Sequence, residues 1–359
     1  MGEGVRRWGF ALGLLGLLAL PFAVGQGLGN TWLRILDFAL LYVMLALGLN
    51  IVVGYAGLLD LGYVAFYAVG AYLYAILASS QFDVHWPSLI LLPLGALAAG
   101  VCGVLLGAPT LRLRGDYLAI VTLGFGEIVR IFINNLNAPI NITNGPQGIS
   151  GIDPIRVASW SFNKPLVLGD GPWALASLYQ YYFLFLLAAA LVVWVSYRLE
   201  DSRIGRAWMA IREDEVAAKA CGVDTRNLKL LAFAMGASFG GMAGGLFAGF
   251  QRFVSPESFG LMESVMILCM VVLGGMGHIP GVILGGLVLS ILPEVFRHGA
   301  GPLQKALFGQ VWLDPESLRM LLFGLALVVV MRFRPSGLWP SPVRRREFDG
   351  ECCDGERLP

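Results

Sequence analysis

Long apolar runs separated by short polar breaks occupy most of the chain. A helix that crosses a bilayer without tilting needs ~20 apolar residues, and several of these runs are shorter than that. The pattern therefore predicts an all-α, polytopic membrane helix bundle with about ten spans, some short or broken, within one transmembrane domain over residues 1–335. The predicted spans are 8–25, 32–53, 58–78, 89–107, 117–134, 178–197, 228–249, 264–273, 281–296 and 318–331.

The first run, 8–25, has two interpretations. Arg6 and Arg7 precede it and small residues at 23–25 end it, a pattern that is also typical of a cleaved signal peptide. We favour a retained first span. In either case the N-terminus starts inside.

Composition and charge agree with a membrane protein. Of the 359 residues, 57% are hydrophobic and only 14% are charged, which is far from a soluble domain. A net charge of +1 without a basic face argues against nucleic-acid binding. Most of the 25 lysines and arginines fall near the N-terminus, in the breaks around 112–114 and 198–229, and after 331. Basic residues favour the cytoplasmic side, so both termini are predicted to be cytoplasmic.

One polar break, 198–229, carries a dense cluster of both charge signs. Within it, the segment 211–224 predicts a short helix. Glu213, Asp214 and Glu215 would occupy its first turn, where acidic groups favour the positive end of the helix dipole.

Gly222 is predicted to end this short helix. Glu215 stands four residues before Lys219 and can pair with it. Between the charges remains a small apolar patch that suits docking into a groove on another protein. The alternative is a charged loop that only fixes the membrane topology. The patch is made of Val216, Ala217, Ala220 and Cys221.

Two further segments lie outside the predicted spans. The loop 135–177 is rich in Asn, Gly and Pro, which predicts turns on the outer face. It either receives a soluble partner or merely connects two spans. The tail 336–359 is predicted to be disordered and cytoplasmic, with Arg344, Arg345 and Arg346 near anionic headgroups.

Glycines interrupt two of the apolar runs. The first of these breaks lies at Gly54 and Gly57, and the apolar run resumes near Asp60. Backbone groups freed at membrane depth are tolerated only where they are buried in protein or line a wet cavity, so paired breaks predict a translocation path. An acid such as Asp60 would need water or a partner there, unless it is simply a helix cap. The second break lies at Gly274, Gly275 and Gly277.

The alternative interpretation of both breaks is that they are ordinary turns between spans. A different charged feature, Glu127 and Arg130, lies inside the run 117–134. The i,i+3 spacing of these two residues lets them pair and face the bundle interior. This intramembrane pair is either an internal tie between helices or a contact to a solute.

The run 228–249 carries glycines at four-residue intervals on two neighbouring ridges. Small residues at this period allow close approach of helix backbones, which predicts packing against another helix. The glycines are Gly236, Gly240, Gly244, Gly241, Gly245 and Gly249.

Catalytic and ligand-binding motifs are missing from the sequence. No phosphate loop of the GlyXXXXGlyLys(Ser/Thr) type occurs, so ATP would have to be used by another subunit. The three histidines are far apart, and the five cysteines have no metal-ligand spacing. We therefore expect no enzyme activity, cofactor or metal in this chain.

Two sets of motifs carry a family resemblance. The short polar helix resembles the Glu-Ala-Ala coupling motif of ABC importer permeases. Five longer stretches together resemble the LivM-type permeases of bacterial branched-chain amino acid ABC importers. The coupling motif is matched by Glu213, Asp214, Glu215, Ala217, Ala218 and Gly222, and the longer stretches are 48–72, 111–130, 205–215, 253–259 and 271–277.

The resemblance implies a permease subunit that moves leucine, isoleucine or valine across the bacterial inner membrane. It also implies a LivH-like second permease, a periplasmic substrate-binding protein, and two ATPase subunits that bind ATP and Mg and seat on the coupling motif. Similar permeases for urea and short amides leave the solute open. A secondary transporter or channel is a further alternative, which would need several acids within its spans.

Overall fold

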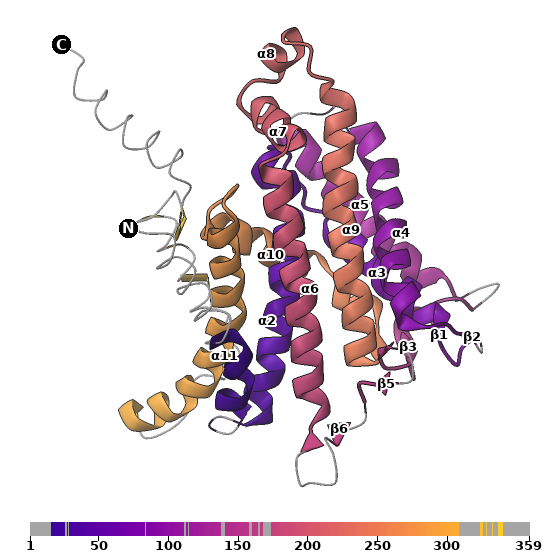
Figure 1. Cartoon of the computed structure of the whole chain (residues 1–359), viewed down its shortest axis with the longest axis vertical. Helices are drawn as coiled ribbons and strands as arrows, with labels where there is room; N and C mark the ends of the chain where they lie inside the picture. Colours follow the sequence, from indigo (N-terminus) through magenta and orange to yellow (C-terminus); the bar gives the residue numbers. More distant parts are fainter. Residues whose placement is uncertain are drawn as a thin grey trace.

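The computed structural model describes residues 16–308 except 26, 28, 83, 111–112, 114, 138–140, 158–159, 164–165 and 168–173, and also 324–325, 328, 332 and 337–339. Helices that run mostly along the long axis of the molecule form a bundle (Figure 1). They are Gly16–Gly25, α2 (Asn30–Leu49), η1 (Asn50–Tyr55), α3 (Val64–Leu77), α4 (Ser88–Thr110), α5 (Asp116–Asn135), α6 (Ser177–Glu200), α7 (Arg203–Glu213), α8 (Glu215–Ala220), α9 (Thr225–Gln251), α10 (Leu261–Gly274) and α11 (Ile279–Phe308).

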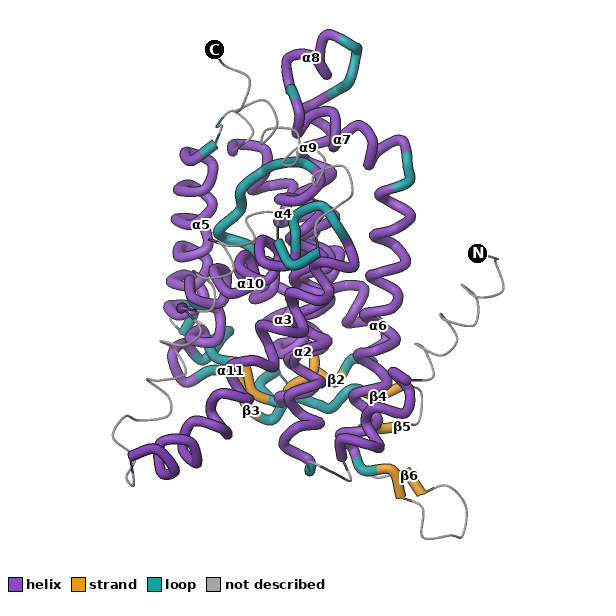
Figure 2. The backbone as a smooth tube through the Cα atoms, turned by 90° about the vertical axis from the view of Figure 1, so that its left-hand side faces the viewer, coloured by secondary structure: helices purple, strands orange, loops and turns teal. Residues whose placement is uncertain are grey.

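Four pairs of short strands, each strand two residues long, lie at one end of the bundle, and α8 lies at the other (Figure 1; Figure 2). Two of them, β4–β5 and β6–β7, and the 3-10 turn η2 (Gly145–Gln147) fall in the loop 135–177, where the sequence predicts turns. A second 3-10 turn, η3 (Pro256–Phe259), precedes α10. The pairs, all antiparallel, are β1 (Ala78–Ser79) with β2 (Val84–His85), β3 (Ile149–Ser150) with β8 (Phe253–Val254), β4 (Arg156–Val157) with β5 (Trp160–Ser161), and β6 (Leu166–Val167) with β7 (Ala174–Leu175).

Five helices in the described part of the chain are long and apolar enough to cross a membrane, and three more are apolar but shorter. The predicted helical class is confirmed at this level. The five are Asn30–Tyr55, Ser88–Thr110, Ser177–Glu200, Thr225–Gln251 and Ile279–Arg297, and the shorter ones are Gly16–Gly25, Val64–Leu77 and Leu261–Gly274.

Some predicted boundaries differ from the observed ones. The run 58–78 becomes a helix only from Val64, because Asp60 accepts a hydrogen bond from the backbone of Gly62 in a turn that precedes the helix. Most of the predicted span 318–331 lies outside the described residues. Of the tail predicted from residue 336, residues 337–339 are described.

The helix α9 lies at the centre of the bundle and packs closely on α3 and α4 (Figure 1). A Cβ on Gly70 of α3 would overlap the carbonyl of Gly241, so glycine is required where these two backbones touch. A Cβ on Gly241 would in turn meet Ala99 of α4. The packing role predicted for the glycine ridges of this helix is confirmed.

Candidate functional site

The polar break after α6 folds into the two short helices α7 and α8. Ser202 caps the start of α7, where its hydroxyl accepts a hydrogen bond from the backbone N–H of Gly205 at 3.1 Å. The side chain of Trp208 is fully buried, and its indole Nε1 donates to the carbonyl of Leu228 at 2.7 Å. The Trp208 bond attaches α7 to the first turn of α9.

The prediction of one continuous helix over 211–224 is wrong, because the chain breaks at Asp214. This residue is extended, with φ −151° and ψ 110°, and its carboxylate accepts hydrogen bonds from the N–H groups of Val216 at 2.8 Å and Ala217 at 3.1 Å. An aspartate in this role starts a new helix. Glu213 therefore ends α7, and Glu215 begins α8.

Gly222 ends α8, as the sequence predicts. It has φ +84°, its N–H donates to the carbonyl of Lys219 at 3.1 Å, and the N–H of Val223 donates to that of Ala218 at 3.1 Å. This pair of bonds is a Schellman motif, in which glycine takes the left-handed position.

The two faces of α8 differ. Ala218 is buried, whereas Val216 is 66% exposed, and Ala217, Ala220 and Cys221 are also exposed. The helix stands beyond the ends of the long helices (Figure 1; Figure 2). The apolar patch predicted from the sequence is therefore open to a partner, although its docking role stays a prediction.

An ion pair that the sequence does not indicate also fixes α8. Glu215 Oε1 lies 2.7 Å from Nζ of Lys229, whose side chain is only 7% exposed. Lys229 belongs to α9, so this contact joins α8 to the next span. The pairing of Glu215 with Lys219 stays a prediction.

The two glycine breaks come together beneath α7. The backbone N–H of Gly277, in the turn between α10 and α11, donates to Asn50 Oδ1 of η1 at 2.8 Å. The carbonyl of Gly54 accepts from Nη1 of Arg212 in α7 at 2.6 Å. Neither Asn50 nor Arg212 is indicated by the sequence pattern, because no local motif signals a contact between distant segments.

The other residues of the breaks lie close by. Gly57 and Gly275 have positive φ angles, of 69° and 114°. Gly274 is the last residue of α10, and its carbonyl accepts from the N–H of Trp339 at 3.2 Å. The breaks are thus located at the α8 end of the bundle, at helix ends rather than at helix centres.

Asp60 is 2% exposed and belongs to a local turn. Its Oδ1 accepts from the N–H of Gly62 at 2.9 Å, and Leu61 N–H donates to Thr122 Oγ1 of α5 at 3.0 Å. The residue also borders a small apolar pocket with Phe66 of α3. Asp60 is therefore not the cap of α3, whose N-cap residue is Tyr63, while a role in the translocation path stays a prediction.

The ion pair of Glu127 and Arg130 is present, with Nη2 of the arginine 2.8 Å from Oε2 of the glutamate. That the pair faces the interior of the assembled bundle stays a prediction. Both residues belong to α5, and their side chains are 31% and 39% exposed. The pair therefore does not tie two helices together.

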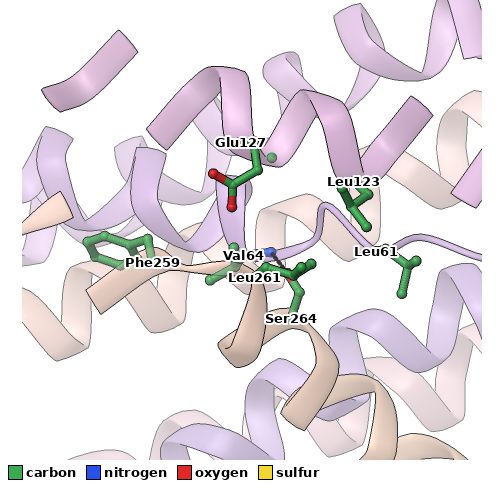
Figure 3. A pocket seen from close by; sticks show the side chains of 8 residues that line it. Leu61, Val64, Leu123, Glu127, Phe259, Leu261 and Ser264 are labelled. Carbon is green, nitrogen blue, oxygen red and sulfur yellow. Dashed lines mark hydrogen bonds between the residues drawn. The ribbon is translucent and has the colours of Figure 1, made fainter. Parts of the chain in front are cut away.

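The Glu127 carboxylate borders a crevice between α5 and the segment that enters α10 that is too narrow to hold a water molecule. Figure 3 shows the side chain pointing from α5 towards the segment that carries Phe259 and Leu261. Ser264 closes one wall, where its hydroxyl accepts from the N–H of Val64 at 3.2 Å. Leu61, Val64, Leu123, Gly126, Glu127, Phe259, Leu261 and Ser264 line the crevice.

A bundle of apolar helices, several of them long enough to cross a bilayer, defines a multi-pass membrane protein. Among the residues that the structure describes, no three His, Cys, Asp or Glu side chains gather as a metal site. The chain matches the family model for the permease component of branched-chain amino acid transport systems over residues 31–331. It therefore belongs to the branched-chain amino acid transport permeases, as a LivM-type member.

Individual relatives agree with this assignment. The chain is 41% identical to the high-affinity branched-chain amino acid permease LivM of Escherichia coli K12, with 99% of this chain and 80% of the relative covered. It is 28% identical to a probable LivM of Methanocaldococcus jannaschii, covering 84% of this chain and 91% of that protein. It is 26% identical to Escherichia coli LivH, covering 84% and 92%. No solved structure matches the chain significantly.

Proposed function

We propose that the chain is one permease subunit of an ABC importer that carries leucine, isoleucine or valine across the bacterial inner membrane. ATP and Mg bind to two separate ATPase subunits, and this chain holds neither. The names of the LivM and LivH relatives support the cargo and the class of transporter. These names do not favour the alternatives of urea or short amides, or a secondary transporter.

The observation that carries the proposal is the exposed helix α8. It presents Val216 and three smaller side chains beyond the bundle, between caps at Asp214 and Gly222 that fix its length. A surface of small apolar groups rimmed by charge can enter a groove on an ATPase subunit. A loop that only fixed topology would need neither cap.

The proposed topology has about ten crossings, with both termini in the cytoplasm. The basic residues of α7 and α8 support this orientation, because they gather at the α8 end, to which residues 337–339 also bind. The end with the strand pairs is then the outer face. There, the loop 135–177 receives a periplasmic substrate-binding protein.

A LivH-like second permease is the proposed partner within the membrane. The paired names of the LivM and LivH relatives support it. On this chain, α5 exposes a row of large apolar side chains. They are Tyr117, Ile120, Val121, Ile128, Ile131 and Phe132.

The test is affinity purification in mild detergent, followed by reconstitution of the recovered complex into liposomes. We expect a second permease and two ATPase subunits to co-purify, and labelled leucine to enter only with ATP and the binding protein. Excess isoleucine and valine, but not urea or acetamide, should compete. Leucine uptake by this chain alone would contradict the proposal.

A further inference from the structure

Arg212, in the last turn of α7, reaches both glycine breaks. Its Nη1 donates to the carbonyl of Gly54 in the first break at 2.6 Å. A Cβ on Gly57 would stand 2.9 Å from Cγ of Arg212, and a Cβ on Gly277 in the second break would stand 3.1 Å from its Nη1. The arginine side chain therefore fits against both backbones only because these positions are glycine.

A second contact joins the breaks directly. Asn50 Oδ1 accepts from the N–H of Gly277 at 2.8 Å, and a Cβ on Gly54 would overlap that oxygen and stand 2.7 Å from the Gly277 nitrogen. Gly57 and Gly277 both have positive φ, 69° and 82°, a region that favours glycine. We call Asn50, Gly54, Gly57, Arg212 and Gly277 the glycine junction.

Gly54 of the first break belongs to the π-helix η1, whose residues Asn50–Tyr55 are all buried. Short π-helical turns are rare and occur frequently at functional sites. The last carbonyls of any helix lack partners within it, and here a donor from another element satisfies that of Gly54. The end of η1 is therefore coupled to the position of α7.

The helix α7 is itself attached to α8 and α9. Trp208 and Ile211 are buried, the indole of Trp208 binds the carbonyl of Leu228, and Glu215 of α8 pairs with Lys229 of α9. A displacement of α8 is thus carried by α7 and the start of α9 as one unit. Arg212 is the residue through which that unit contacts the glycine breaks.

We propose that Arg212 is the positioning residue through which movement of α7 and α8 reaches both breaks at once. The inference rests on the proposed function, in which an ATPase subunit moves α8. Displacement of Arg212 shifts the end of η1 together with the turn that begins α11. The spans behind them move as a pair, because α2 packs on α11, with Val43 against Gly286.

The test uses the full complex with its second permease, ATPase subunits and binding protein in liposomes. The variants are Arg212→Ala and Arg212→Lys. Arg206→Ala is the matched control, since Arg206 is exposed on the same helix and its Nη1 donates to the carbonyl of Asp201 rather than to a glycine break.

We expect the Arg212→Ala complex to assemble and to hydrolyse ATP in the absence of binding protein. Stimulation of hydrolysis by the leucine-loaded binding protein and leucine uptake should both fall about tenfold, because both need the movement that passes through Arg212. Arg212→Lys should be intermediate, since one ammonium can reach the Gly54 carbonyl but lacks the planar fork. Arg206→Ala should match the wild type.

Asn50→Ala gives an independent measurement, since it removes the direct contact between the breaks. Its loss of coupling should not add to that of Arg212→Ala, because residues of one network act together. Additive losses would contradict a single junction.

Normal uptake and stimulation in Arg212→Ala would overturn the inference. So would failure of both Arg212 variants to assemble, which would assign the residue to folding alone. Failure of the proposed function would look different, because the wild-type chain would then lack bound ATPase subunits or move leucine without ATP.

Discussion

Single polar side chains set the geometry of the α8 end. Asp214 starts a helix, Trp208 joins two helices through one carbonyl, and Lys229 holds α8 by its ion pair. Trp208 and Lys229 satisfy groups of low exposure that would otherwise lack a partner, which would cost free energy. The removal of one partner should therefore also change the position of the helix that it contacts.

Glu215→Lys is predicted to release α8 from α9. The substitution would place a second ammonium beside Lys229. We expect the free energy of unfolding to fall by about 2 kcal/mol, which is less than for a fully buried pair because Glu215 is partly exposed. ATP hydrolysis stimulated by the binding protein, and uptake, should be lost while membrane insertion persists. The exchange Glu215→Lys with Lys229→Glu should restore both, and normal coupling in the single variant would contradict a role for this pair.

Asp37 in α2 poses the opposite case. It is 0% exposed, and among the described residues neither of its carboxylate oxygens has a hydrogen-bond partner. Arg34, one turn earlier, donates instead to Gln251 at 2.7 Å. An acid retained at such a cost within a span is typical of a functional requirement rather than a stabilising one.

Asp37→Asn is predicted to raise the free energy of unfolding by about 1 kcal/mol, because it removes an unpaired acid. The thermal midpoint of the protein in detergent should rise accordingly. Asp116→Asn is the control, since Asp116 is an exposed acid in the first turn of α5 and its carboxylate stays in contact with solvent. It should leave the midpoint unchanged. A lower midpoint for Asp37→Asn would mean that the carboxylate is stabilised by a partner in the assembled protein.

At the scale of elements, α8 is too short to be stable by itself. Helices well below ~12 residues are marginal in water, so the six residues of α8 depend on their caps and on Ala218 against the bundle. The sequence indicates the cap at Gly222 because glycine favours positive φ. It does not indicate the break at Asp214, because three consecutive acids all suit a first turn.

Gly222→Pro is predicted to abolish docking of the ATPase subunits. Proline cannot adopt φ +84° and has no N–H to donate to Lys219. Gly222→Ala should have a milder effect and cost about 1 kcal/mol of stability. A Cβ there meets no atom within 4 Å, so only the backbone is strained.

Protection of Cys221 measures this directly. Cys221 is an exposed member of the docking patch, and a chain with the other four cysteines replaced by serine lets a maleimide report on it alone. The wild type should react in inside-out vesicles and become protected when ATPase subunits bind. Gly222→Pro should stay reactive, and protection equal to that of the wild type would show that the helix end is not needed.

For the whole molecule, local patterns predict the elements better than the contacts between them. Helical runs, glycine ridges and the exposed patch follow from periodicity and residue type. The meeting of Gly54, Gly277 and Arg212 does not, because it joins three segments far apart in the chain. The exposure of the Glu127 and Arg130 pair is similarly decided by what α5 packs against.

The Glu127 and Arg130 pair has the charges needed to recognise an amino-acid cargo. A zwitterionic amino acid carries an ammonium that complements Glu127 and a carboxylate that complements Arg130, and it could contact them only once α5 moves away from the segment before α10, because the crevice beside Glu127 is closed. An ion pair exposed on an apolar helix face is costly in lipid, so this face should meet the second permease along the cargo path.

Glu127→Gln is therefore predicted to lower leucine uptake about tenfold at saturating binding protein, the effect of losing one charged hydrogen bond of about 1.4 kcal/mol. The matched control is Glu294→Gln, because Glu294 forms the same i,i+3 pair with Arg297 on α11. It should leave uptake unchanged while both complexes assemble. Equal losses would indicate a general effect on the spans, and unchanged uptake in both would remove Glu127 from the path.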